Sequence, residues 1–240
     1  MKMKLGLSFA SIGVLFGIHR TTASRIFYFI LSNLLRAMER WIPEPPTAVV
    51  QVAMPPCFRV HYPECRFIID CTELRTEEPP TIEQQRALFS HYKGNYTLKF
   101  LVAILPNGTV TFVSKAYGGR ASDTYITVDS GFLDRVEPGD VVLADKGFPG
   151  IRAPLQGQKA VLVLPPFSKG NAQFTHEEML QTYHVAQVRI HVERVIQRIK
   201  LFNILNVRVP IDLVPYMSDI MRMCCILTNL QAPVIKEGSE

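Results

Sequence analysis

The order of strand-like and helix-like segments beyond residue 60 constrains the fold of this chain more than any other feature. A β-branched and apolar run at Cys65–Leu74 predicts a first strand. Two further runs, Thr97–Leu105 and Thr109–Lys115, flank a Pro-Asn-Gly turn and predict a hairpin. Helical spacing of the apolar residues then predicts a helix over Ser122–Val136. This half of the region therefore predicts three strands followed by a helix.

The second half of the region adds two short apolar runs and two long helical segments. Asp140–Asp145 and Ala160–Leu164 have the composition of buried strands. Glu177–Leu205 and Leu213–Leu230 are expected to be helical. This order favours an α/β fold with a mixed sheet flanked by helices, as in RNase H-like domains, although other α/β layouts share it.

A proline-rich stretch divides the chain. Ile42–Thr47 contains three prolines and Pro55-Pro56 follows it, and such a segment cannot continue a helix and favours extended backbone. We therefore expect a helix-turn-helix unit at 1–41, a linker at 42–57, the α/β domain at 58–232 and a tail at 233–240.

The first unit has the pattern of a DNA-reading helix pair. An apolar helix from Phe9 is followed by a turn at Gly17-Ile18 and by a second helix. The start of the second helix carries hydrogen-bond donors suited to bases and phosphates in a major groove. These candidate DNA-binding residues are His19, Arg20, Thr21, Thr22 and Arg25. The alternative is a helical hairpin that serves only for packing.

Composition sets broad limits on function. The chain has 240 residues, 48% of them hydrophobic, which is enough for one substantial core. Its charge of +5 is compatible with a polyanionic partner but does not require one. The five cysteines include no Cys-x-x-Cys pair and indicate free thiols in a reducing compartment. No apolar stretch reaches the roughly 20 residues of a membrane span, so we expect no membrane association.

Three acidic residues stand out as candidate metal ligands. Asp70 and Asp145 each end an apolar strand-like run, where a carboxylate is costly unless it meets a cation or several donors. Glu193 shares a narrow helical stripe with Arg189 and Lys200, at the edge of the apolar face. The alternatives are two aspartates that cap turns and an ordinary Arg-Glu pair on a solvated helix.

If these carboxylates come together, they would repel one another unless divalent cations neutralise them. Hard oxygen ligands select Mg²⁺ or Mn²⁺, and two such ions roughly 4 Å apart support in-line phosphoryl transfer. In that scheme Asp70 bridges two ions, and Asp145 and Glu193 each complete one coordination sphere. The expected reaction is metal-dependent cleavage of DNA.

At these motifs the chain resembles the DDE superfamily endonucleases, specifically PIF/Harbinger-like (THAP-associated) transposases. Asp70 and Asp145 are separated by 74 residues, and Asp145 and Glu193 by 47, which is similar to the spacing in that branch. Further blocks that resemble the family are Ser90–Thr97, Tyr117–Asp123, Gly139–Phe148 and Arg189–Arg194.

The resemblance implies a transposase or transposase-derived endonuclease in the nucleus that binds transposon ends or target DNA. It also implies a homo-oligomer and a separate DNA-binding partner protein. Arg189 and Lys200 match family positions expected to hold DNA phosphates or orient the glutamate. Lys146 stands where many relatives have Arg and would also contact DNA, whereas Ala186 replaces a Tyr found on this helix in related transposases.

Two other functions remain open at this stage. One is a non-catalytic, domesticated protein that binds DNA or another partner and retains the fold. The other is an unrelated α/β metal phosphohydrolase, which is disfavoured because no histidine-rich site accompanies the carboxylates.

Overall fold

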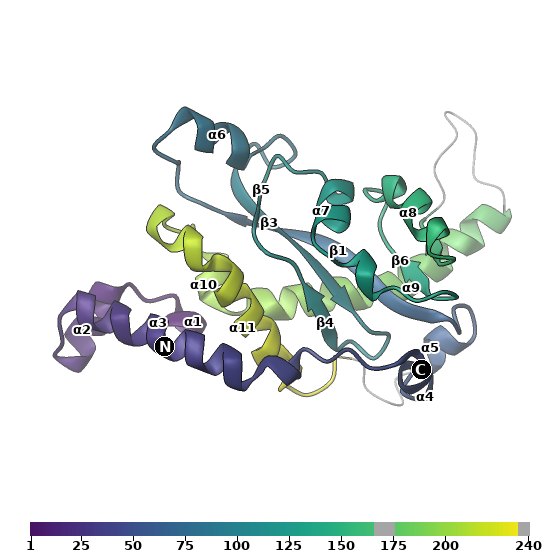
Figure 1. The fold of residues 1–240 in the computed structure, drawn as a ribbon, viewed down its shortest axis with the longest axis horizontal. Coiled ribbons are helices and arrows are strands. Elements are labelled where there is room, and N and C mark those ends of the chain that lie inside the picture. Colours follow the sequence, from purple (N-terminus) through teal and green to yellow (C-terminus); the bar gives the residue numbers. More distant parts are fainter. Residues whose placement is uncertain (166–175, 235–240) are drawn as a thin grey trace.

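A computed structural model describes residues 1–165 and 176–234 (Figure 1). A twisted sheet lies at its centre with helices on both faces, and the N-terminal helices lie at one end of the long axis (Figure 1). Of the tail expected at 233–240, residues 235–240 lie outside the described part of the chain.

In the described residues, seven strands form one mixed sheet with the central order β2-β3-β1-β6-β7. β1 pairs with β3 antiparallel and with β6 parallel, while β4 and β5 also pair with β3. The strands are β1 (Cys65–Arg75), β2 (Phe89–Ser90), β3 (Asn95–Ile104), β4 (Val110–Val113), β5 (Tyr117–Gly118), β6 (Val141–Leu143) and β7 (Val161–Val163). The expected hairpin of residues 97–115 is confirmed as β3 and β4.

Side chains alternate across the sheet and build two hydrophobic cores. Ile68 of β1 and Leu143 of β6 belong to the core shared with α9 (His176–Lys200) and α11 (Met217–Asn229). Phe67 and Ile69 belong to the opposite core, which includes residues of α7 (Asp123–Asp129) and α8 (Arg152–Gly157). Because successive strand residues face opposite sides, each functional residue of β1 can be assigned to the α9 face or to the α7 face.

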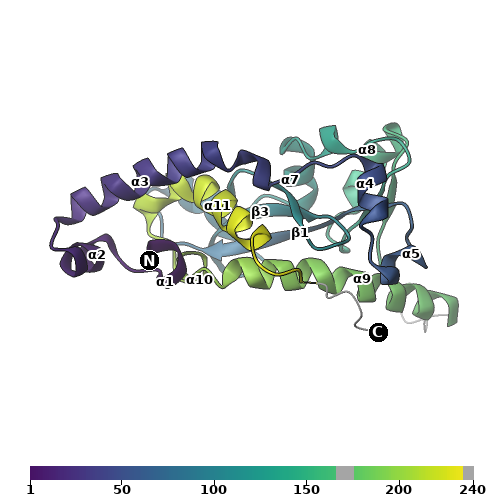
Figure 2. The same cartoon turned by 90° about the horizontal axis from the view of Figure 1, so that it is seen from below.

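The remaining helices surround this framework. They are α1 (Lys2–Leu5), α2 (Phe9–Phe16), α3 (Arg20–Ala37), α4 (Thr47–Val52), α5 (Pro56–Arg59), α6 (Ile82–Leu88) and α10 (Asn203–Asn206), with 3₁₀ turns at Glu39–Trp41, Leu133–Arg135, Pro149–Ile151 and Ile211–Tyr216. α3 lies beside α11 (Figures 1 and 2). The ring of Tyr28 stacks on that of Tyr216 with centroids 3.9 Å apart, so the N-terminal unit packs on the α/β domain.

The expected fold class, a mixed α/β sheet flanked by helices and preceded by a helix-turn-helix unit, is confirmed. The expected helix over Ser122–Val136 is too long. α7 ends at Asp129 and Gly131 adopts φ +79°, a left-handed conformation that interrupts the helix.

The proline-rich stretch contains two short helices, α4 and α5, in place of purely extended backbone. Pro46 and Pro55 occupy the caps that precede them, where a missing N–H costs nothing and the fixed φ favours a helical start. In the part of the chain that the structure describes, no helix is long and apolar enough to cross a membrane.

Candidate active site

Asp70 lies on β1, and Asp145 lies in the loop that follows the neighbouring parallel strand β6. Ile68 of β1 is in register with Leu143 of β6, and each aspartate follows two residues later. Both therefore face α9. Asp70 Oδ1 accepts a hydrogen bond from the Cys71 N–H at 2.8 Å, and Asp145 Oδ1 accepts one from the Lys146 N–H at 2.6 Å. Local backbone groups thus orient both carboxylates.

Arg189 of helix α9 links the third acidic residue, Glu193, to Asp145. Arg189 Nη1 lies 3.3 Å from Asp145 Oδ1, and its Nη2 lies 3.5 Å from Glu193 Oε1. The Arg189 side chain is only 14% exposed, whereas those of Asp145 and Glu193 are about half exposed. The mostly buried guanidinium therefore joins two carboxylates that are themselves half exposed. Its Nε is buried without a hydrogen-bond partner.

Asp70 belongs to the same electrostatic environment but lies deeper. Burial raises the pKa of its carboxyl group to about 6, against the opposing effects of the Cys71 N–H and of Arg189. The negative charges of Asp145 and Asp123 raise this pKa further. Arg189 therefore connects Asp145 with Glu193, and the charges of Arg189 and Asp145 both influence Asp70, where burial and the neighbouring carboxylates outweigh the groups that favour the charged form.

Lys200 lies about two turns beyond Glu193 on α9. Its Nζ donates to the backbone carbonyl of Glu73 at 3.2 Å. Burial lowers the pKa of Lys200, and the nearby Lys93 lowers it further, whereas Asp70 and Glu73 act in the opposite direction. Lys200 thus provides a second, half-buried positive charge near Asp70.

The donor set suits a hard divalent cation, because it consists of carboxylate oxygens and includes a buried aspartate that lacks full compensation. Within residues 1–165 and 176–234, however, no three Asp, Glu, His or Cys side chains are arranged closely enough to hold a metal ion. The cation that contacts Asp145 and Glu193 in this arrangement is Arg189. The residue types fit Mg²⁺ or Mn²⁺, and a guanidinium lies between two of the three ligands.

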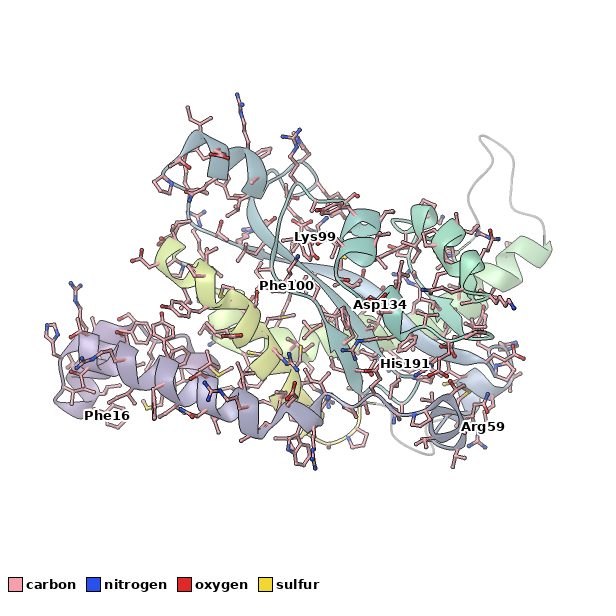
Figure 3. All side chains as sticks on the ribbon, in the orientation of Figure 1. Phe16, Arg59, Lys99, Phe100, Asp134 and His191 are labelled. Carbon is pink, nitrogen blue, oxygen red and sulfur yellow. The ribbon has the colours of Figure 1, made fainter. Side chains whose placement is uncertain are left out.

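A second charged cluster, which the sequence patterns did not predict, lies on the α7 face and consists of Lys99, Glu73 and Asp123. The antiparallel register of β1 with β3 places Glu73 opposite Lys99, so the alternation of β3 could have revealed the pair. Figure 3 shows Lys99 on the strand beside α7. Ser122 caps α7, because its hydroxyl accepts a hydrogen bond from the Tyr125 N–H at 3.1 Å.

The expected DNA-binding residues of the N-terminal unit lie apart from the carboxylates. Gly17 adopts φ +64° at the expected turn, and α3 starts at Arg20 with His19 as its N-cap. His19 Nδ1 lies 2.9 Å from Thr21 Oγ1. His19, Arg20, Thr21 and Arg25 are exposed and Thr22 is half-buried. α2 and the start of α3 lie at the opposite end of the molecule from β6 and α8 (Figure 1).

Lys146 is exposed beside Asp145, where it could meet a polyanion that approaches the carboxylates. The side chain of Ala186, where the resemblance predicted a Tyr, lies outside the part that the structure describes. Another residue of α9, His191, is buried with its ring 5.7 Å from that of Phe58. Burial lowers its pKa to about 4, so the ring is neutral at pH 7.

Comparison with protein families agrees with this arrangement. A family model described as the helix-turn-helix of DDE superfamily endonuclease matches residues 1–39. The model described as DDE superfamily endonuclease matches residues 69–229, which include all three carboxylates and most of the chain. No curated protein and no solved structure gave a significant match. The chain belongs to the DDE superfamily endonuclease family.

Proposed function

We propose that this protein is a PIF/Harbinger-like transposase, or an endonuclease derived from one, that cuts DNA strands and joins them. Its cofactor is Mg²⁺ or Mn²⁺, and the proposed ligands are Asp70, Asp145 and Glu193. The observation that supports the proposal is that Arg189 contacts both Asp145 and Glu193, while burial raises the pKa of Asp70 and the charges of Arg189 and Asp145 act on it.

The acidic residues would hold the metal ions, and the basic residues beside them would contact DNA. Asp70, on its strand, is the most rigidly placed ligand, and Asp145 and Glu193 complete the set from a loop and a helix. Bound divalent ions would supply Lewis-acid activation of a water or 3′-hydroxyl and stabilise the leaving oxygen. Arg189 reduces repulsion between Asp145 and Glu193 and, with Lys146 and Lys200, offers positive charge to DNA phosphates.

DNA is the proposed partner at both ends of the molecule. The exposed His19, Arg20, Thr21 and Arg25, with Thr22, would hold DNA through α3 while the carboxylates act on a distant phosphodiester. Because joining two DNA ends requires two active sites near each other, we also propose a homo-oligomer, with specificity shared by a separate DNA-binding protein. Activity on chromosomal DNA implies a nuclear location.

The direct test is cleavage of supercoiled plasmid by the full chain in Mg²⁺, Mn²⁺ or EDTA. Asp145→Asn and Glu193→Gln remove one negative charge each and should reduce cleavage at least about a hundredfold, since each removes a ligand. Asp134→Asn, at an exposed position outside the site, should cleave like the parent chain. Hydrolysis of small phosphate esters by the parent in place of DNA would indicate a different phosphohydrolase.

A non-catalytic DNA-binding protein is the second candidate, because Arg189 already contacts two of the three carboxylates. That function requires DNA binding by the parent chain without metal-dependent cleavage, and binding that Asp145→Asn leaves unchanged. Metal-dependent cleavage lost in both active-site variants excludes it.

A further inference from the structure

The cluster of Lys99, Glu73 and Asp123 is almost entirely enclosed. Lys99 Nζ lies 3.1 Å from Asp123 Oδ1 and 3.5 Å from Glu73 Oε1, and it donates to the Ala121 carbonyl at 3.1 Å. The side chains of Lys99 and Glu73 are 12% and 8% exposed, and that of Asp123 is 26% exposed. The Thr97 hydroxyl donates to Glu73 Oε2 at 2.8 Å. Charges enclosed in this way are costly to leave unpaired, so Lys99 fixes both carboxylates.

The cluster lies directly behind the proposed active site. Cys71 and Glu73 alternate with Asp70 along β1 and point to the α7 face, where burial and the negative charge of Asp123 raise the pKa of the Cys71 thiol. Asp123 is near enough to Asp70 to act on it electrostatically. A single strand thus separates the Lys99 cluster from the acidic residues on the α9 face.

Asp123 also touches the loop that carries Asp145. A Cβ atom at Gly147 would lie 2.7 Å from Asp123 Oδ2, and one at Gly150 would lie 2.6 Å from Thr124 Cγ2. The loop after Asp145 therefore packs against the first residues of α7 at distances that only glycine allows. An Asp side chain can usually rotate away from such a contact, but Lys99 holds Asp123 through an ion pair and hydrogen bond to its Oδ1.

We propose that Lys99 and Asp123 are a positioning pair that sets the Asp145 loop against β1, and so fixes the spacing between Asp70 and Asp145 that a divalent ion requires. This inference rests on the proposed function. Neither residue contacts the ion. Partners of metal ligands that act in this way change metal affinity about 10- to 100-fold when they are replaced.

The test is Mn²⁺ binding to the full chain, measured from the loss of the free-ion electron paramagnetic resonance signal. Lys99→Met alone leaves two enclosed carboxylates without their cation and is expected to lower the midpoint of thermal unfolding. The double variant Lys99→Met/Asp123→Asn removes one of those negative charges and should recover much of the lost thermal stability. It still lacks the ionic contact, so we expect its Mn²⁺ affinity to remain at least about tenfold weaker than that of the parent.

Lys115→Met is the matched control. Lys115 pairs with Asp129 at 3.1 Å at the other end of α7, and its side chain is 64% exposed. The substitution makes the same chemical change, loss of a lysine that pairs with an aspartate of α7, at the end of that helix away from the Asp145 loop. We expect the Mn²⁺ affinity of this variant to equal that of the parent.

The outcomes separate the two proposals. If the parent binds no Mn²⁺, or if Asp145→Asn binds it equally well, the proposed function fails and the positioning pair fails with it. If Asp145→Asn abolishes binding but the double variant binds Mn²⁺ like the parent, the proposed function stands and the positioning role is refuted. Recovery of stability without recovery of Mn²⁺ affinity supports the positioning role, since a purely structural role would restore both.

Discussion

Asp70 should make the metal-free protein less stable at neutral pH than an uncharged residue would. Its pKa is raised from the ordinary value of 3.8 to about 6, mainly by burial. The folded chain therefore binds the Asp70 proton more tightly than the unfolded chain does. The free energy of unfolding therefore rises as pH falls from about 6 toward 4. Above pH 6 the buried charge of Asp70 destabilises the folded chain by its full amount.

The size of the effect follows from the same pKa values. The difference between about 6 and 3.8 corresponds to about 3 kcal/mol at pH 7. Asp70→Asn keeps the size of the side chain and an oxygen that can accept from the Cys71 N–H, but it removes the buried charge. In EDTA at pH 7 we expect this variant to be more stable by about 3 kcal/mol, or about 6–12 °C in melting temperature for a chain of this size.

The assay is urea unfolding of the parent and of Asp70→Asn in EDTA from pH 4 to pH 8. At each pH the free energy of unfolding of the parent is subtracted from that of the variant. The difference should be small near pH 4 and reach its full value above pH 6. A variant that is less stable than the parent at pH 7, or a difference that does not change with pH, would refute the assignment of Asp70 as an insufficiently compensated buried carboxylate.

Three further outcomes are expected. Burial lowers the pKa of His191 to about 4, so the free energy of unfolding falls by up to about 3 kcal/mol as pH falls from 6.5 toward 4. His191→Phe should abolish this loss of stability at acid pH, measured by urea unfolding. An unchanged loss would contradict the conclusion that His191 is a buried, neutral histidine. Gly119→Ala places a Cβ 2.1 Å from Thr97 Oγ1 and 2.7 Å from the Leu88 carbonyl oxygen, and we expect calorimetry to show a free energy of unfolding lower by about 1–3 kcal/mol. In the control Gly157→Ala the added Cβ meets nothing within 4 Å, so the free energy of unfolding should not fall. Arg20→Ala and Arg25→Ala should each lower the salt dependence of DNA binding, measured by fluorescence anisotropy, by about one phosphate contact, and a slope equal to that of the parent would exclude α3 from the DNA interface.

Local patterns in the sequence predicted the elements that position the site. Two apolar runs that each end in Asp predicted that Asp70 and Asp145 follow neighbouring strands, and a helical stripe predicted the contact between Arg189 and Glu193, because strand alternation and helical periodicity act over short range. The turn at Gly17 and the start of α3 were predictable for the same reason. The end of α7 before Gly131 could have been predicted in the same way, because a glycine just past the last helical residue is a common helix stop signal.

The contacts that connect distant segments could not be predicted from local patterns. Lys99 pairs with Asp123, 24 residues later, and Arg189 reaches Asp145 across 44 positions of the chain. Helical spacing indicated the link between Arg189 and Glu193, but nothing local indicated that the same guanidinium also contacts Asp145. The burial of His191 depends likewise on Phe58, which belongs to a short helix in the proline-rich stretch.

The most direct test of the central claim is an anomalous-difference map from crystals of the full chain soaked in Mn²⁺. We predict a peak coordinated by oxygens of Asp70 and Asp145, with Arg189 moved from its contacts with Asp145 and Glu193, and no such peak in crystals of Asp145→Asn. A map without a peak at these carboxylates, in a parent chain whose Arg189 still joins Asp145 to Glu193, would contradict the claim that the three acidic residues form a metal-dependent nuclease site.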